Sequence, residues 1–176
     1  MCSRFGEYLC DRCCEIWKLP PQRLFIASVP IYITVPYTEQ VARVVVKAKE
    51  NGNKEAQKLL ARVLAKNLRQ LRCDNEIRNA LLVPIPSSRR STRRRGENFL
   101  LTIVEKLMAE FDDPNISIEI AEILRHRRKV LDQSGLNQSE RRENMRGAFT
   151  LVDPLEALSK RKQTIIIVDE IGRAHV

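Results

Sequence analysis

The stretch "LLVPIPSS", Leu81–Ser88, is a short, unbroken apolar run that ends in prolines and serines. A run of this kind is typical of a strand that a parallel sheet buries on both faces. A helical apolar pattern follows over 98–111, and "ISIEIAEIL", Ile116–Leu124, has the composition of a second strand. The order strand, helix, strand predicts an α/β fold built on a mostly parallel sheet.

A third strand is predicted from "TIIIVDE", Thr164–Glu170, in which four β-branched apolar residues precede the carboxylates of Asp169 and Glu170. Open parallel sheets bind their ligands just beyond the carboxyl ends of the strands. The run "RRSTRRRG", Arg89–Gly96, follows Ser88 as a basic loop. We therefore expect this loop and the two acids to lie at the same edge of the sheet, within a core that spans 80–170.

The preceding segment, 20–79, predicts two short strands and a helical hairpin. "RLFIASVPIYITVPY" contains strand patterns at Leu24–Ala27 and Ile31–Val35. Apolar residues then recur at helical spacing on both sides of "ENGN", where Gly52 suits a left-handed cap. The apolar face of the first predicted helix is Val41, Val44, Val45 and Ala48. That of the second is Ala56, Leu59, Leu60, Val63, Leu64, Leu68 and Leu71.

Residues 1–19 contain a cysteine knuckle. Cys10 and Cys13 form a C-x-x-C pair, and Cys2 offers a third thiolate. A structural zinc site needs four ligands, so these three predict an incomplete, zinc-finger-like site that lacks a cysteine upstream of Met1. The alternative is a set of unligated thiols in a reducing compartment.

The composition restricts the class of partner. The 176 residues carry a net charge of +9, which favours phosphates, pyrophosphate, phosphosugars or nucleic acid as partners. No run approaches the roughly 18 apolar residues of a membrane span, and the N-terminus lacks the apolar core of a signal peptide. We therefore expect a cytoplasmic protein without membrane insertion.

One long segment, "DQSGLNQSERRENMRGAF" (Asp132–Phe149), has no apolar period over most of its length. Its composition favours a solvated loop. A loop of this length inside a compact domain is often functional, for example as a lid over an active site, so both interpretations stay open.

Several of these motifs together resemble the ComF family of type I phosphoribosyltransferase-like proteins, over nearly the whole chain. The resemblance begins with the cysteine knuckle, Tyr37 and the Lys-x-x-Gly turn at 49–52. It continues with the Val-Pro-x-Pro strand at 83–86 and the Arg-Gly-x-Asn element at 95–98. The most specific blocks are Gln-x-Gly-Leu at 133–136 and Arg-x-x-Asn-x-x-Gly-Ala-Phe at 141–149.

The resemblance implies a fold of the type I phosphoribosyltransferase kind and binding of 5-phosphoribosyl 1-diphosphate, usually with magnesium. Members of this class displace pyrophosphate at the anomeric carbon. The implied acceptors for the ribose hydroxyls are Asp169 and Glu170. The implied pyrophosphate and phosphate ligands are Ser87, Ser88, Arg89 and Arg95, and the implied flexible-loop residues are Gln133, Arg141 and Asn144.

The sequence departs from the family after Asp169. The family has Val-Asp-Asp and a Thr-Thr-Gly phosphate loop, whereas this chain has Glu170 and then "IGRAHV". Residues 171–176 match the translation of a common sequencing adapter, so we expect a non-native tail on a truncated chain. Because backbone donors to the 5-phosphate are then missing, we expect weak or no binding of 5-phosphoribosyl 1-diphosphate and no turnover.

Two other functions remain open. The chain could be a nucleic-acid-binding accessory protein that contacts single-stranded DNA or the DNA-uptake machinery, since ComF proteins are associated with competence and the net charge suits such partners. It could also retain the fold for regulation, without turnover. The arginines of 89–95 would serve DNA phosphates or pyrophosphate equally well, and they would also suit a merely solvated basic face.

Overall fold

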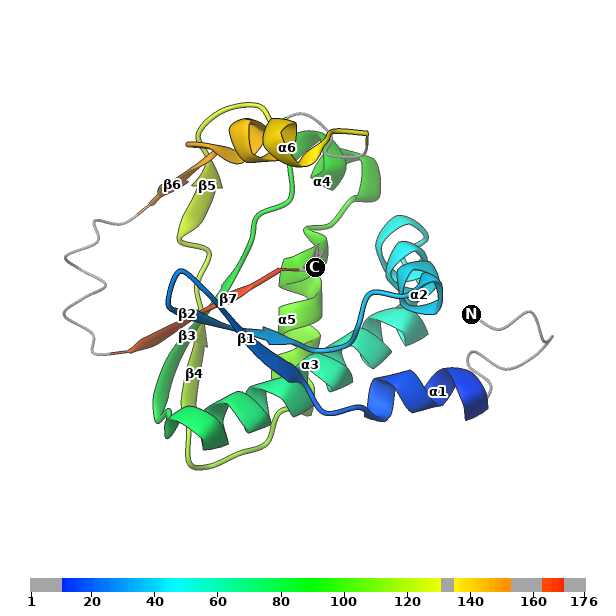
Figure 1. The fold of residues 1–176 in the computed structure, drawn as a ribbon, viewed down its shortest axis with the longest axis vertical. Helices are drawn as coiled ribbons and strands as arrows, with labels where there is room; N and C mark the ends of the chain where they lie inside the picture. The colour runs from blue at the N-terminus through cyan, green and yellow to red at the C-terminus, as the bar shows by residue number, and fades with distance from the viewer. Residues whose placement is uncertain (1–10, 131–134, 153–162, 170–176) are drawn as a thin grey trace.

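The computed structural model describes residues 11–130, 135–152 and 163–169 (Figure 1). Its helices are α1 (Asp11–Lys18), α2 (Glu39–Glu50), α3 (Lys54–Asn75), α4 (Arg89–Arg95), α5 (Phe99–Glu110) and α6 (Gln138–Met145). Its strands are β1 (Gln22–Ile26), β2 (Val29–Ile33), β3 (Asn79–Pro84), β4 (Ser117–Ile120), β5 (Leu124–His126), β6 (Phe149–Leu151) and β7 (Thr164–Val168). Within these residues, no helix is both long and apolar enough to cross a membrane.

The centre of the fold is a parallel sheet of β3 with β4 on one side and β7 on the other. The three strands predicted for the 80–170 core therefore contribute to one sheet, and the expected α/β class is confirmed. β3 is buried along its length from Ala80 to Pro84, as its unbroken apolar run predicts. Two antiparallel ribbons, β1–β2 and β5–β6, accompany this sheet.

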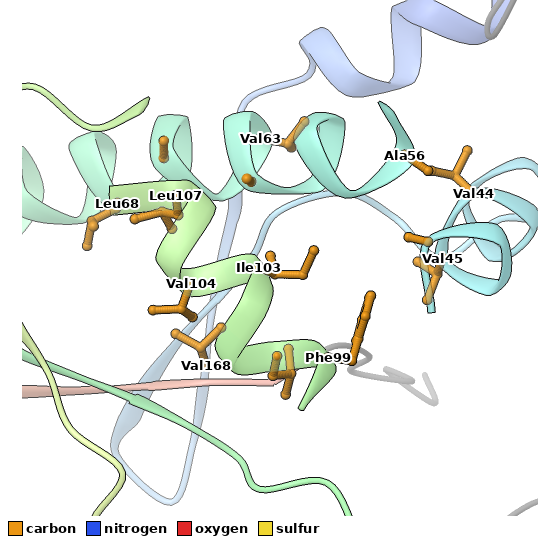
Figure 2. Close-up of a cluster of buried hydrophobic side chains, with 14 of the residues drawn as sticks. Val44, Val45, Ala56, Val63, Leu68, Phe99, Ile103, Val104, Leu107 and Val168 are labelled. Carbon is orange, nitrogen blue, oxygen red and sulfur yellow. The ribbon is translucent and has the colours of Figure 1, made fainter. Parts of the chain in front are cut away.

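One face of the sheet packs against α5, and α5 in turn packs against α3 (Figure 2). Phe99, Ile103 and Val104 of α5 are almost fully buried, and Val168 at the end of β7 belongs to the same core. Burial of one such side chain contributes about 1.5–3 kcal/mol, so this layer holds α5 on the sheet.

The helical hairpin of α2 and α3 forms as expected. The four predicted residues of α2 are buried, and Thr38 and Asn53 cap the two helices by accepting hydrogen bonds from Val41 N and Ala56 N. Gly52 has a φ of +59°, in the left-handed region that favours glycine.

The buried face of α3 is only partly the predicted one. The buried side chains are Ala56, Gln57, Ala61, Val63, Ala65, Asn67 and Leu68. Leu59, Leu60 and Leu64 are half-buried instead. These three leucines still pack against the core cluster that contains α5, so the predicted face borders the buried one.

The prediction of one strand over Ile116–Leu124 was wrong in its extent. β4 ends at Ile120, and the chain then leaves the parallel sheet to form β5, which pairs antiparallel with β6. Composition does not reveal this change of partner, because apolar residues continue through the junction.

Two segments expected to be loops contain helices. Ser88 caps α4 and Gly96 ends it at a φ of +77°, while α6 begins with a complete capping box of Asn137 and Glu140. Neither helix contains a buried residue, so neither produces the apolar period from which helices are predicted. The cap residues were the available signal.

Candidate functional site at the carboxyl edge of the sheet

The loop after β3 and Asp169 were expected to lie together at the carboxyl edge of the sheet, and the register of β3 and β7 decides whether they do. Pro84 is paired with Val168, and the backbone N–H of Ile85 donates to the carbonyl oxygen of Val168 at 3.0 Å. Because these strands are parallel neighbours, Ser87 and Ser88 emerge from the same edge as Asp169. Asp169 is exposed there, and the two serines are half-buried.

Ser88 shapes the turn that follows β3. Its Oγ accepts a hydrogen bond from the backbone N–H of Ser91 at 3.2 Å and lies 2.9 Å from Ser91 Oγ. Arg89 is the next residue, and it is exposed on α4. The turn therefore presents polar side chains at the sheet edge from a capped, hydrogen-bonded backbone.

Arg95 points inward, unlike the rest of the arginine run. Its side chain is only 5% exposed, and Nη1 lies 3.2 Å from Oε1 of Glu50 at the end of α2. Its Nη2 donates to Ser87 Oγ at 3.3 Å. Arg94 contacts the same Glu50 at 2.6 Å, but its side chain is 65% exposed. The sequence could not separate these two arginines, because only tertiary packing distinguishes them.

His126 was not a predicted site residue, yet it contacts the same turn. Its Nε2 lies 2.9 Å from the carbonyl oxygen of Pro86, and its ring packs on Phe149 with centroids 4.9 Å apart. Within the described part of the chain, its buried Nδ1 has no hydrogen-bond partner. The β5–β6 ribbon is thereby attached to the turn after β3.

Arg128 attaches α6 to the same ribbon. Its Nη2 donates to the carbonyl oxygens of Glu143, Asn144 and Arg146 at 3.1, 3.0 and 2.8 Å, at the end of α6. The predicted loop residues Arg141 and Asn144 are both half-buried on α6. α4, α6 and the ribbon gather at one end of the molecule, at the top of Figure 1.

The net positive charge of the chain is concentrated in these elements. Segments 89–95, 125–129 and 138–146 contain twelve of the 31 lysines and arginines but two of the 22 acids, a net charge of +10. The remainder of the chain, with nineteen basic and twenty acidic residues, is almost neutral. The charge that suggested an anionic partner therefore belongs mainly to one end of the fold.

Several predicted site residues lie outside the described residues, namely Cys2, Cys10, Gln133 and Glu170. Cys13 lies within α1, in a stretch whose side chains are not described. Among the residues that the structure does describe, no three histidine, cysteine or acidic side chains group in a way that could hold a metal ion. The zinc site therefore stays a prediction.

A scan of known protein families finds no model that matches this chain, and a search of curated proteins finds no match either.

Proposed function

We propose that the chain is a phosphoribosyltransferase-like protein that binds 5-phosphoribosyl 1-diphosphate with magnesium and transfers or recognises the phosphoribosyl group. The observation that carries the proposal is the pairing of Pro84 with Val168, because it brings the Ser87–Ser88 turn and Asp169 to one sheet edge. This edge is where parallel α/β sheets bind ligands. The motifs that resemble the ComF family add support, and so does the positive end of the fold.

The residues at this edge have suitable chemistry for the two halves of the substrate. The carboxylate of Asp169 is a strong acceptor for ribose hydroxyls. The hydroxyls of Ser87 and Ser88 and the guanidinium of Arg89 offer donors for pyrophosphate oxygens. In the transfer, an acceptor nucleophile would bond to the anomeric carbon as its bond to pyrophosphate breaks. The protein's contribution would be position and charge.

The residues present are compatible with magnesium. The ion prefers oxygen ligands, keeps several waters, and is commonly held by one or two carboxylates together with substrate phosphates. Asp169, exposed at the edge, supplies one carboxylate of that kind. Bound magnesium would offset the charge of the departing pyrophosphate.

The proposal is tested by an NMR titration of the chain with magnesium and 5-phosphoribosyl 1-diphosphate. We expect weak binding, with a dissociation constant of about 1 mM, and shifts of the amide signals of residues 87–89 and 169. Asp169→Asn should weaken binding about tenfold, whereas Asp112→Asn, an exposed acid that precedes β4, should not. Equal effects of the two variants, or shifts confined to other parts of the fold, would contradict the proposal.

The charge distribution favours a second function, binding of single-stranded DNA. A polyanion would interact with exposed Arg89, Arg90 and Arg93 on α4 and with the neighbouring basic ribbon. Fluorescence anisotropy with a labelled oligonucleotide should then show affinity that falls linearly with the logarithm of salt concentration. Each arginine that contacts a phosphate should lower the slope by about 1 when it is replaced by alanine. A slope that these replacements leave unchanged would exclude this face as the DNA site.

A further inference from the structure

Glu50, at the end of α2, lies far in sequence from the candidate site but is connected to it through Arg95. Burial of a guanidinium is costly unless its charge is paired and its N–H groups have acceptors. Here Glu50 pairs with Nη1 and Ser87 Oγ accepts from Nη2, while the buried Nε has no partner within the described residues. The guanidinium thus bridges the helical hairpin and the turn after β3.

This bridge determines what Ser87 can do. A hydroxyl group has one hydrogen to donate and can accept as well. Because Ser87 Oγ accepts from a charged donor, its own hydrogen is left to donate, and acceptance from a cation makes the hydroxyl a better donor. The described residues provide no acceptor for that hydrogen. Ser87 is half-buried at the carboxyl edge, where an anionic oxygen could accept it.

We propose that Glu50 and Arg95 are positioning residues that hold the Ser87 hydroxyl as a donor to a pyrophosphate oxygen. The inference rests on the proposed function and changes the expected role of Arg95, which acts through Ser87 and not by touching the ligand. Its burial agrees with this role, because a side chain that is 5% exposed has little surface for an anion to reach. Glu50 keeps the guanidinium in place by pairing with its other nitrogen.

The test uses inorganic pyrophosphate with magnesium as the probe and NMR titration of the 176-residue chain. The variants are Ser87→Ala, Glu50→Gln and the two combined. Ser87→Ala should weaken binding about tenfold or more, as expected for loss of a hydrogen bond to a charged group. Glu50→Gln should weaken binding by a similar factor. The double variant should bind pyrophosphate about as well as the single variant with the lower affinity, since both changes remove the same interaction.

Arg94→Ala is the matched control. Arg94 also contacts Glu50 and carries the same charge, but it is mostly exposed and does not contact Ser87. We expect it to change the affinity for pyrophosphate by less than about threefold. If Glu50→Gln does not fold, Arg95→Lys replaces it, because lysine keeps the charge but lacks the planar fork that bridges Glu50 and Ser87.

Four results would overturn the inference. The first is a loss of pyrophosphate affinity in the double variant that equals the product of the two single losses. The second and third are an unchanged affinity and a higher affinity in Glu50→Gln. The fourth is that the wild type does not bind pyrophosphate. Tighter binding would show that Arg95, released from Glu50, contacts the anion directly. If the wild type binds pyrophosphate but not 5-phosphoribosyl 1-diphosphate, the proposed function fails while the expected coupling between Glu50 and Ser87 would still support this inference.

Discussion

The imidazole Nε2 of His126 lies 2.9 Å from the carbonyl oxygen of Pro86. A carbonyl oxygen can only accept, so Nε2 carries the hydrogen and donates it. The contact joins two parts of the chain separated by forty residues, the β5–β6 ribbon and the turn after β3. The position of the candidate site therefore depends on a residue outside the predicted motifs.

We expect replacement of His126 to loosen this attachment. His126→Phe retains a ring that can pack on Phe149 but leaves the Pro86 carbonyl oxygen without its donor, which should cost about 1 kcal/mol. His126→Ala loses the ring contact as well and should cost about 2 kcal/mol. Urea unfolding gives both values. Wild-type stability of the Phe variant would show that the hydrogen bond contributes nothing.

Arg128 should stabilise the folded form of α6. α6 contains no buried residue, and the Arg128 guanidinium donates to the carbonyl oxygens of Glu143 and Asn144 in its last turn and of Arg146 just beyond it. Arg128→Ala should destabilise this helix by about 1–3 kcal/mol, because each lost bond involved a charged donor. Faster amide hydrogen exchange within 138–146 would report the change.

The matched control for that experiment is Arg127→Ala. Arg127 is the exposed neighbour of Arg128 and carries the same charge. If both alanine variants speed hydrogen exchange in α6 equally, the effect is one of net charge and the three contacts are not responsible.

The parts of the fold that the sequence predicted correctly are those in which burial leaves a local apolar pattern, either a continuous run or a helical period. β3 is a continuous apolar run, and α2 shows apolar residues at helical spacing, so both were predictable from local pattern. α4 and α6 were missed because they contain no buried residue. Their stability comes from caps and tertiary hydrogen bonds, which an apolar pattern does not record.

The candidate site was predictable to the level of a sheet edge. Strand polarity placed Ser88 and Asp169 together, because parallel neighbours end at the same edge. The contacts of Arg95 with Glu50 and of His126 with Pro86 were not predictable, since each joins residues forty or more positions apart. No local spacing distinguishes an arginine that turns inward from its exposed neighbour.

Asp113 should make stability depend on pH in the acid range. Hydrogen bonds from the backbone and side chain of Asn115, together with the charge of Arg72, lower the pKa of this carboxyl. A lowered pKa means that the folded state binds the proton less readily than the unfolded state. The stabilisation is therefore fully present above the ordinary pKa of about 4 and is lost as pH falls through the folded pKa.

The variant that tests this is Asp113→Asn, which keeps an acceptor for Asn115 but has no charge. Its free energy of unfolding should be lower than that of the wild type at neutral pH, and the difference should shrink as pH falls below about 4. Urea unfolding at several pH values measures it. A difference that is the same at low and neutral pH would mean that the charge of Asp113 does not stabilise the fold.

The β1–β2 turn offers a stabilising substitution. Ala27 and Ser28 connect the paired residues Ile26 and Val29, and their φ values are +47° and +67°. Two positive φ values characterise the type I′ turn, which favours Asn-Gly. Replacing the pair by Asn-Gly should raise the free energy of unfolding by about 1 kcal/mol, because neither new residue resists this conformation as alanine and serine do. A fall in stability would show that the turn adopts another form in solution.

The last prediction concerns the two faces of β7. Each of two adjacent isoleucines lies on a different face, so substitutions at these positions test the faces one at a time. Ile166 is half-buried against the core that contains α5, whereas Ile167 points to the other face and is 61% exposed. Threonine keeps the β-branched shape that a strand prefers but has a hydroxyl where isoleucine has an ethyl group, so the two variants differ only in the face they change. Ile166→Thr should lower the free energy of unfolding by about 1–3 kcal/mol, since the hydroxyl enters an apolar core, and Ile167→Thr should lower it by less than about 0.5 kcal/mol.

Thermal and urea unfolding of both variants provide the comparison. An equal cost at the two positions would show that another part of the protein covers the outer face of β7 in solution, and the register of β7 on β3 would then need to be determined again by cross-strand amide contacts.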